Sequence, residues 1–143
     1  MAKADIQKTV DVEKAKLFSA ITRYEEYPKF VDGCTGVQVE RKGPGHARVT
    51  YKVSMMRDIQ YTLDHVEDEA SGRVEWKLVA SDSLKANTGR WILKDAGTGK
   101  TAVAYEIDID FNFPVPGFVL SKLVKGSLPS MIEGFVKRAR KAK

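Results

Sequence analysis

Strict alternation of apolar and polar residues marks the middle of this chain. The clearest run is TAVAYEIDIDFNF at 101–113, where apolar side chains recur at every second position and acidic side chains fill most of the places between them. Because successive side chains of a strand point to opposite faces, this pattern predicts a β-strand with one apolar and one polar face. Shorter runs of the same kind occupy residues 47–55, 59–65, 73–78 and 89–94.

The connections between these runs are short and made of turn residues. They are KGPGH (42–46), MMRD (55–58), DEASG (68–72) and DAGTGK (95–100). Links of this length join antiparallel neighbours, whereas parallel strands need a long crossover. Residues 35–113 therefore predict an antiparallel meander of about six strands, and a weaker alternation at 4–12 predicts a first strand.

Helical spacing replaces the alternation at 12–30. This segment predicts two short helices that meet around residues 22–25, the first with Asp11 as its N-cap and the second ending near Val31. Proline restricts the residue before it, so Pro28 is expected to keep Tyr27 out of the helical conformation.

The C-terminal segment predicts a long amphipathic helix. An apolar stripe contains Leu120, Leu123, Val124, Leu128, Met131, Ile132, Phe135 and Ala139. About 25 helical residues would span roughly 37 Å, enough to cover the apolar face of a curved sheet. Pro129 removes a helical hydrogen bond, so the helix should bend. The bend either follows the twist of the sheet or forms a cover that shifts to admit a ligand.

Length and composition indicate one ordinary globular domain over residues 1–143. Hydrophobic residues make up 43% and charged residues 30% of the 143 positions. The first residues lack the apolar core of a secretory signal and no apolar stretch is long enough to cross a bilayer, so a soluble, cytoplasmic protein is expected. Cys34 is the only cysteine, and two histidines without metal-ligand spacing predict no metal site and no cofactor.

Positive charge is concentrated at the C-terminal end. Residues 121–143 hold seven Lys or Arg against Glu133 alone, while the net charge of the whole chain is +5. The cations at the end of the segment, Lys137, Arg138, Arg140, Lys141 and Lys143, can complement a helix dipole in solvent. The alternative is transient contact with an anionic membrane or with a ribosome; no DNA partner is expected.

The string YEEYPKFVDGCTGV at 24–37, the order of elements and GFVKRAR at 134–140 resemble the START-like or Bet v 1-like (SRPBCC) superfamily. The likeness is to its polyketide cyclase/dehydrase and lipid-transport group, near the coenzyme Q-binding and ribosome-association-toxin proteins. It is carried by Tyr24, Tyr27, Pro28, Phe30 and Cys34, and it covers essentially the entire chain. The resemblance implies an α+β helix-grip fold, in which a curved antiparallel sheet of about seven strands wraps the C-terminal helix around an apolar cavity.

The residues expected to face that cavity are the candidate ligand-binding set. They are Tyr51, Val53, Tyr61, Leu63, His65, Trp76, Leu78, Trp91, Leu93, Tyr105, Ile107, Phe111, Phe118, Leu123, Leu128, Met131 and Phe135. The same aromatic side chains could instead form a plain packed core, and composition does not separate the two.

No catalytic residue is predicted. His65 shares the apolar face of its strand without an acidic partner there, so a core histidine is favoured over a general base. Cys34 is expected to be a small buried apolar residue. Glu106, Asp108 and Asp110 belong to a solvated face paired with Arg90 or Lys94, and GTGK at 97–100 lacks the spacing of a phosphate loop.

The sequence is consistent with three functions. The first is non-catalytic binding or transport of a lipid, quinone or polyketide-like molecule between sheet and helix, with Tyr51, Tyr61 or His65 holding a polar group. The alternatives are an enzyme of the polyketide cyclase/dehydrase type and a ribosome-associating, toxin-like protein.

Overall fold

The computed structural model describes residues 2–54 and 57–141, with the backbone alone at 2, 123 and 124. The strands are β1 (Ala2–Val10), β2 (Cys34–Gly43), β3 (His46–Ser54), β4 (Asp58–Asp68), β5 (Arg73–Ser81), β6 (Leu84–Asp95) and β7 (Thr101–Phe111). The helical segments are α1 (Lys14–Thr22), the 3-10 turn η1 (Tyr24–Glu26), α2 (Tyr27–Phe30), α3 (Gly117–Lys122), the π-helical turn η2 (Leu123–Ser127) and α4 (Leu128–Lys141).

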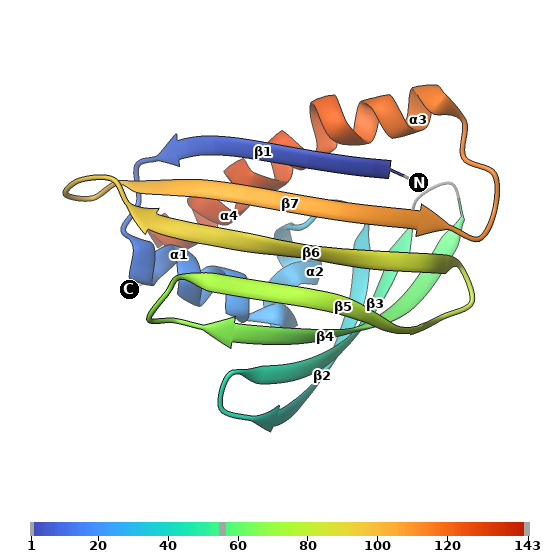
Figure 1. The fold of residues 1–143 in the computed structure, drawn as a ribbon, viewed down its shortest axis with the longest axis horizontal. Coiled ribbons are helices and arrows are strands. Elements are labelled where there is room, and N and C mark those ends of the chain that lie inside the picture. Colours follow the sequence, from blue (N-terminus) through green and yellow to red (C-terminus); the bar gives the residue numbers. More distant parts are fainter. Residues whose placement is uncertain (1, 55–56, 142–143) are drawn as a thin grey trace.

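All seven strands form one antiparallel sheet in the order β1-β7-β6-β5-β4-β3-β2. The sheet is strongly curved, and α4 crosses its inner face with α1 and α2 beside it (Figure 1). This arrangement confirms the predicted helix-grip fold, with about seven strands, two short helices after the first strand and a closing C-terminal helix.

The two faces of the sheet differ as the alternation predicts. Val49, Val74 and Leu93 on the inner face are fully buried. On the outer face, Arg90 donates to Glu106 across neighbouring strands, as predicted, and the Arg48 Nε atom lies 2.8 Å from the Asp64 carboxylate. Ion pairs of this kind make the outer face polar and suited to contact with water, while the inner face remains apolar.

The N-terminal helices differ from the prediction in two details. The residue before α1 is Glu13 rather than Asp11, and its side chain forms no capping hydrogen bond. Tyr27 has helical dihedral angles although Pro28 follows it, and α2 begins at Tyr27. Pro28 occupies the first turn of α2, where a helix needs no backbone N–H, and this offsets the steric preference.

The C-terminal segment is helical from Gly117 to Lys141, but it is not one regular helix. The π-helical turn η2 separates α3 from α4, and Pro129 lies in the first turn of α4. A proline cannot donate to the carbonyl four residues earlier, so the regular pattern is interrupted where the bend is expected. The predicted irregularity is therefore a change of helix type that precedes the proline.

Gly89 leaves space for the indole of Trp76 in the centre of the sheet. A Cβ atom at position 89 would lie 2.3 Å from Cζ2 of Trp76 and 2.5 Å from the carbonyl oxygen of Glu106. Gly89→Ala is therefore expected to lower the free energy of unfolding by about 1–3 kcal/mol, the usual cost of overpacking.

Urea unfolding measures this loss, with Gly36→Ala as the matched control. A Cβ atom at position 36 would meet only the flexible Lys52 side chain, at 3.6 Å. Equal stability of the Gly89→Ala variant and the parent protein would contradict the close packing of Trp76 over β6.

Candidate functional site

An aromatic cluster packs between the sheet and α4, and Phe135 lies at its centre. The Phe135 ring contacts Tyr27, Phe30 and Trp91 edge-to-face, with ring centroids 5.1, 4.9 and 5.2 Å apart. Tyr105 continues the cluster by packing 4.8 Å from Trp91. These rings hold α2, α4 and the sheet together.

A second row of rings runs along the inner face of β3 and β4. His65 stacks on Tyr24 with ring centroids 4.4 Å apart, and its Nε2 atom lies 2.8 Å from the hydroxyl of Tyr51. Tyr51 in turn stacks on Tyr61 at 5.3 Å. Burial lowers the pKa of His65 to about 3, so its imidazole is neutral at physiological pH.

The Tyr51–His65 pair has one more polar hydrogen than it can use internally. A tyrosine and a neutral histidine carry two polar hydrogens, and their mutual hydrogen bond uses one. If Tyr51 donates, the remaining hydrogen is on His65 Nδ1, which has no partner among the described residues. If Nε2 donates, the remaining hydrogen is on the Tyr51 hydroxyl. Both tautomers therefore leave a buried donor that can bind an acceptor oxygen.

The other end of Tyr24 joins a polar network at the edge of this row. Its hydroxyl donates to Glu67 at 2.6 Å, and Arg41 donates to both oxygens of the same carboxylate at 3.1 and 3.0 Å. Arg41 also donates to the carbonyl oxygen of Thr22. The network ties η1 to the sheet and keeps the Tyr24 ring against His65.

Burial of the inner face changes from one end of the sheet to the other. Near α1 and the C-terminal half of α4, Val10, Leu93 and Val103 are at most 4% exposed. Toward α3 the inner face is mixed. Ile59, opposite Val53, and Leu84, opposite Phe111, are 3% and 4% exposed, whereas the half-buried side chains there are Val53, Tyr61, Leu78, Ile107 and Phe111. Figure 1 places α1 and α3 at opposite ends of the sheet. The inner face is sealed at one end and partly open at the end where the helix is irregular.

The structure places most of the predicted ligand-binding set on this inner face or on α4, which crosses it. The buried members are Tyr51, Leu63, His65, Trp76, Trp91, Leu93, Tyr105, Leu128 and Phe135, and the half-buried members are Val53, Tyr61, Leu78, Ile107, Phe111 and Met131. Phe118 differs from the others because it is 78% exposed on α3. The side chain of Leu123 lies outside the described residues.

Three residues of this region were absent from the predicted set. Asn87 is 3% exposed and accepts a hydrogen bond from the indole N–H of Trp76 at 2.9 Å. Its position, two residues before Gly89 in the alternation, was a signal that it faces inward. Tyr24 and Tyr27 belong to the string that carries the family resemblance, but a string alone does not place their rings in the core.

The other residues considered as possible sites, Cys34 and the basic C-terminal residues, mostly make contacts that stabilise the fold. Cys34 is buried, and burial raises the pKa of its thiol, so the reactive thiolate form is disfavoured. Among the basic C-terminal residues, Arg138 pairs with Glu26, Arg140 donates to the carbonyl of Asp11, and Lys137 is exposed. Lys143 lies outside the described residues.

Two further properties concern the described part of the chain. No helix in it is long and apolar enough to cross a membrane. Within the same residues, no three His, Cys, Asp or Glu side chains come together as a metal site would require.

The curved sheet gripping a C-terminal helix defines a START-like, Bet v 1-like domain. The sequence model of the family described as polyketide cyclase/dehydrase and lipid transport matches residues 10–136, so this chain belongs to that family. No curated protein sequence matches the chain.

Solved structures with the same fold share little sequence with it. The START superfamily protein of Mycobacterium smegmatis has a TM-score of 0.84 and 17% identity, with 99% of each chain covered. The ZhuI aromatase/cyclase of Streptomyces sp. R1128 has a TM-score of 0.83 and 12% identity, over 97% of this chain and 93% of that one. The STAR-related lipid transfer protein of Xanthomonas axonopodis has a TM-score of 0.79 and 9% identity, over 96% and 85%.

Proposed function

We propose that this protein binds one apolar small molecule without catalysis, between the inner face of the sheet and the C-terminal helix. The observation that carries the proposal is the half-buried apolar end of that face, which lies toward α3. The irregular turn η2 follows α3 directly. Apolar surface left partly exposed there is stabilised by a ligand at about 25 cal/mol per Å² buried, less the cost of ordering.

The buried polar pair defines one feature of the ligand. Because Tyr51 and His65 retain one unused donor, the proposed ligand carries an acceptor oxygen, such as a carbonyl, on an otherwise apolar body. A quinone, a fatty acid or a polyketide-like molecule meets this requirement. Membership of a family that includes lipid-transport proteins supports the same class.

The first measurement is mass spectrometry of an organic extract of the purified protein, compared with an extract of an unrelated protein. A reproducible, near-stoichiometric lipid or quinone would name the ligand class. The second is titration of the protein with the neutral dye Nile red, which reports binding even when the natural ligand has been lost.

Leu78→Lys is expected to weaken Nile red binding about 10-fold, since it places a charge among apolar side chains at the half-buried end. Leu78 lies opposite Leu63 on the inner face and is half-buried, so the folded state should persist. Val79→Lys is the matched control, because Val79 is the next residue of β5, lies at a register shift between β4 and β5, and is 42% exposed. Equal affinity in both folded variants would reject the proposed site.

The alternative is an enzyme of the cyclase/dehydrase type, and the Tyr51–His65 hydrogen bond is the observation that favours it. General bases work best with a pKa near the operating pH, and burial lowers the pKa of His65 to about 3. The pair is therefore better suited to orienting a ligand than to taking a proton. Turnover of a linear poly-β-ketone that Tyr51→Phe abolishes would reverse this preference.

The membrane and ribosome contacts predicted for the basic C-terminal residues gain no support from the family or from the similar structures. Neither the description of the family nor the names of the similar proteins mention a membrane or a ribosome. Two of these basic residues, Arg138 and Lys141, instead line a hollow beside α1.

A further inference from the structure

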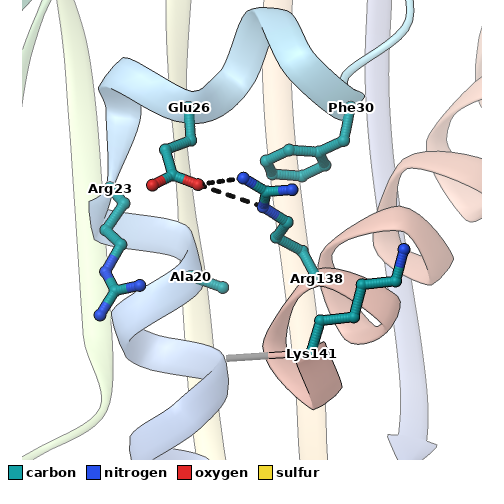
Figure 2. A pocket seen from close by; sticks show the side chains of 6 residues that line it. All are labelled: Ala20, Arg23, Glu26, Phe30, Arg138 and Lys141. Atoms are coloured by element: carbon teal, nitrogen blue, oxygen red, sulfur yellow. Dashed lines mark hydrogen bonds and ion pairs between the residues drawn. The ribbon is translucent and has the colours of Figure 1, made fainter. Parts of the chain in front are cut away.

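A small hollow lies outside the aromatic cluster, between the first helix and the end of α4. Its volume is about 270 Å³, and its walls come from Ala20, Arg23, Glu26, Phe30, Arg138 and Lys141. Figure 2 shows the Glu26–Arg138 ion pair in the middle of these side chains, with the head groups of Arg23 and Lys141 on either side of it. The hollow is smaller than the roughly 300–1,000 Å³ of sites for drug-sized ligands. Its size suits a single chemical group rather than a whole lipid.

Charge in this hollow is unbalanced. Arg23, Arg138 and Lys141 contribute three positive charges, and Glu26 is the one carboxylate of the lining. Within the described part of the chain, neither Arg23 nor Lys141 forms an ion pair with a carboxylate, whereas Arg138 donates to Glu26 from both Nε and Nη2. The lining therefore has a net charge of about +2, which a dianion would neutralise.

The guanidinium of Arg138 is held in place from two sides. Glu26 accepts both hydrogen bonds on the same oxygen, Oε1, with the Nε atom at 3.2 Å, and the Phe30 ring lies 5.6 Å from the guanidinium carbon. Arg23 follows α1, far in the sequence from α4, which carries both Arg138 and Lys141, but the fold brings the two segments together. Planar guanidinium groups fixed in this way recognise phosphate oxygens with directional hydrogen bonds.

We propose that this hollow binds the phosphate group of a phosphomonoester, with Arg23, Lys141 and Arg138 as its ligands and Glu26 as a competing internal anion. The chemistry is shared by a soluble phosphate ester and by the headgroup of phosphatidic acid. Because Glu26 directly precedes α2, which packs on Phe135, a phosphate that takes Arg138 from Glu26 also removes a link between η1 and α4. The binding site is separate from the apolar site of the proposed function, so the two can fail independently.

The competing explanation is purely structural. Arg23 follows the C-terminal end of α1, and Arg138 and Lys141 are in the last turn of α4, where cations interact favourably with the helix dipole. Such cations need no ligand. The Glu26→Gln variant separates the two cases, because it releases Arg138 from its internal anion and should raise phosphate affinity only if the hollow is a binding site.

The test has two arms at pH 7.5 and constant ionic strength. One is calorimetric titration with glycerol 3-phosphate, and the other is co-sedimentation with phosphatidylcholine vesicles that do or do not contain phosphatidic acid. The variants are Arg23→Gln with Lys141→Gln, Glu26→Gln, and the matched control Lys16→Gln with Lys137→Gln. The control removes the same charge from exposed positions of α1 and α4 outside the hollow.

Binding that falls about 10-fold in the Arg23/Lys141 variant, is unchanged in the control and rises about 5-fold in Glu26→Gln is the expected result. This pattern with glycerol 3-phosphate identifies a soluble ester, and the same pattern with phosphatidic acid vesicles alone identifies a lipid headgroup. Equal weakening in both double variants would show diffuse attraction by net charge and overturn the site. No binding in either arm, or no gain in Glu26→Gln, would also overturn it.

Discussion

Replacing Phe135 with alanine is expected to lower the free energy of unfolding by about 3–5 kcal/mol, the usual range for a buried phenylalanine. The side chain is 1% exposed, and its ring contacts Tyr27, Phe30 and Trp91 with centroids 4.9–5.2 Å apart. Substitution removes the transfer free energy of the ring and leaves a cavity among three other rings. Because those rings belong to α2 and β6, the loss weakens the attachment of α4 to both.

Urea unfolding followed by tryptophan fluorescence measures this loss, since Trp91 reports directly on its neighbour. In thermal unfolding the same change corresponds to a fall in Tm of about 10–15 °C, at roughly 3 °C per kcal/mol for a chain of this length. The control is Phe118→Ala, because Phe118 is 78% exposed and should change stability by no more than about 0.5 kcal/mol. Similar losses in the two variants would contradict the central position of Phe135.

The sheet could be predicted from the sequence because its signal is local. Alternation in 101–113 assigns Val103, Tyr105 and Ile107 to one face, and the structure pairs them with Leu93, Trp91 and Gly89 of β6. Short turns then leave antiparallel neighbours as the only arrangement. Burial of one face fixes the register, since a shift of one residue would turn every apolar side chain to solvent.

The C-terminal helix could be predicted only in part from the local sequence. The stripe through Leu128, Ile132 and Phe135 predicted a buried helix face, and the structure buries all three side chains. The π-helical turn at η2 was not predicted, because Pro129 fixes which hydrogen bond is lost but not how the preceding residues rearrange. That choice depends on packing against the sheet.

The contacts of His65 are another case that the strand pattern leaves open. Its face was predicted correctly, but its hydrogen-bond partner was not predicted, since the residues directly opposite His65 are Ala47 of β3 and Trp76 of β5. Tyr51 lies opposite Tyr61, four residues or about 13 Å away along β4 at roughly 3.3 Å per residue. The long side chain of Tyr51 reaches His65 because it leans along the curved inner face. Tyr24, which stacks on His65, belongs to η1 and not to a strand.

Composition did not predict which of the basic residues at the C-terminal end would come together in the fold. Their sequence allowed a solvated helix end or a basic contact surface, and it did not distinguish Lys137 from Lys141. The structure places Arg138 and Lys141 in one hollow with Arg23, which is more than one hundred residues earlier, and leaves Lys137 outside it. A cluster of charges in the sequence becomes a candidate binding site only when the fold places those side chains around a common hollow.

Lowering the pH from 7 to 5 is expected to cost about 2 kcal/mol of unfolding free energy through His65 alone. Burial lowers the pKa of its imidazole from 6.5 to about 3 in the folded state. Below pH 6.5 the unfolded chain therefore binds a proton that the folded chain does not, and stability falls as the pH falls. The loss continues toward pH 3, where it reaches about 4 kcal/mol.

The carboxylates become protonated at lower pH than His65 does in the unfolded chain, so they contribute little to the stability change between pH 7 and 5. Hydrogen bonds from Arg138 and Arg90 lower the pKa of Glu26 and of Glu106 from an ordinary value of 4.5. Stability that depends on such a group is present above its unfolded pKa and is lost only as the pH falls below it. Between pH 7 and 5 both carboxylates remain mostly ionised in either state, with about a quarter of each protonated in the unfolded chain at pH 5, so His65 is the main source of the slope.

Urea unfolding at pH 7, 6 and 5 tests this, with His65→Gln and His46→Gln compared with the parent protein. His65→Gln changes the absolute stability but should remove about 2 kcal/mol of the pH dependence, because glutamine does not ionise. His46→Gln is the matched control, because the His46 side chain is 42% exposed and the substitution leaves His65 in place. A His65→Gln variant with the same slope as the parent would show that the imidazole is accessible to protons in the folded state. In that case it could serve as a base, and the cyclase/dehydrase alternative would gain the group it needs.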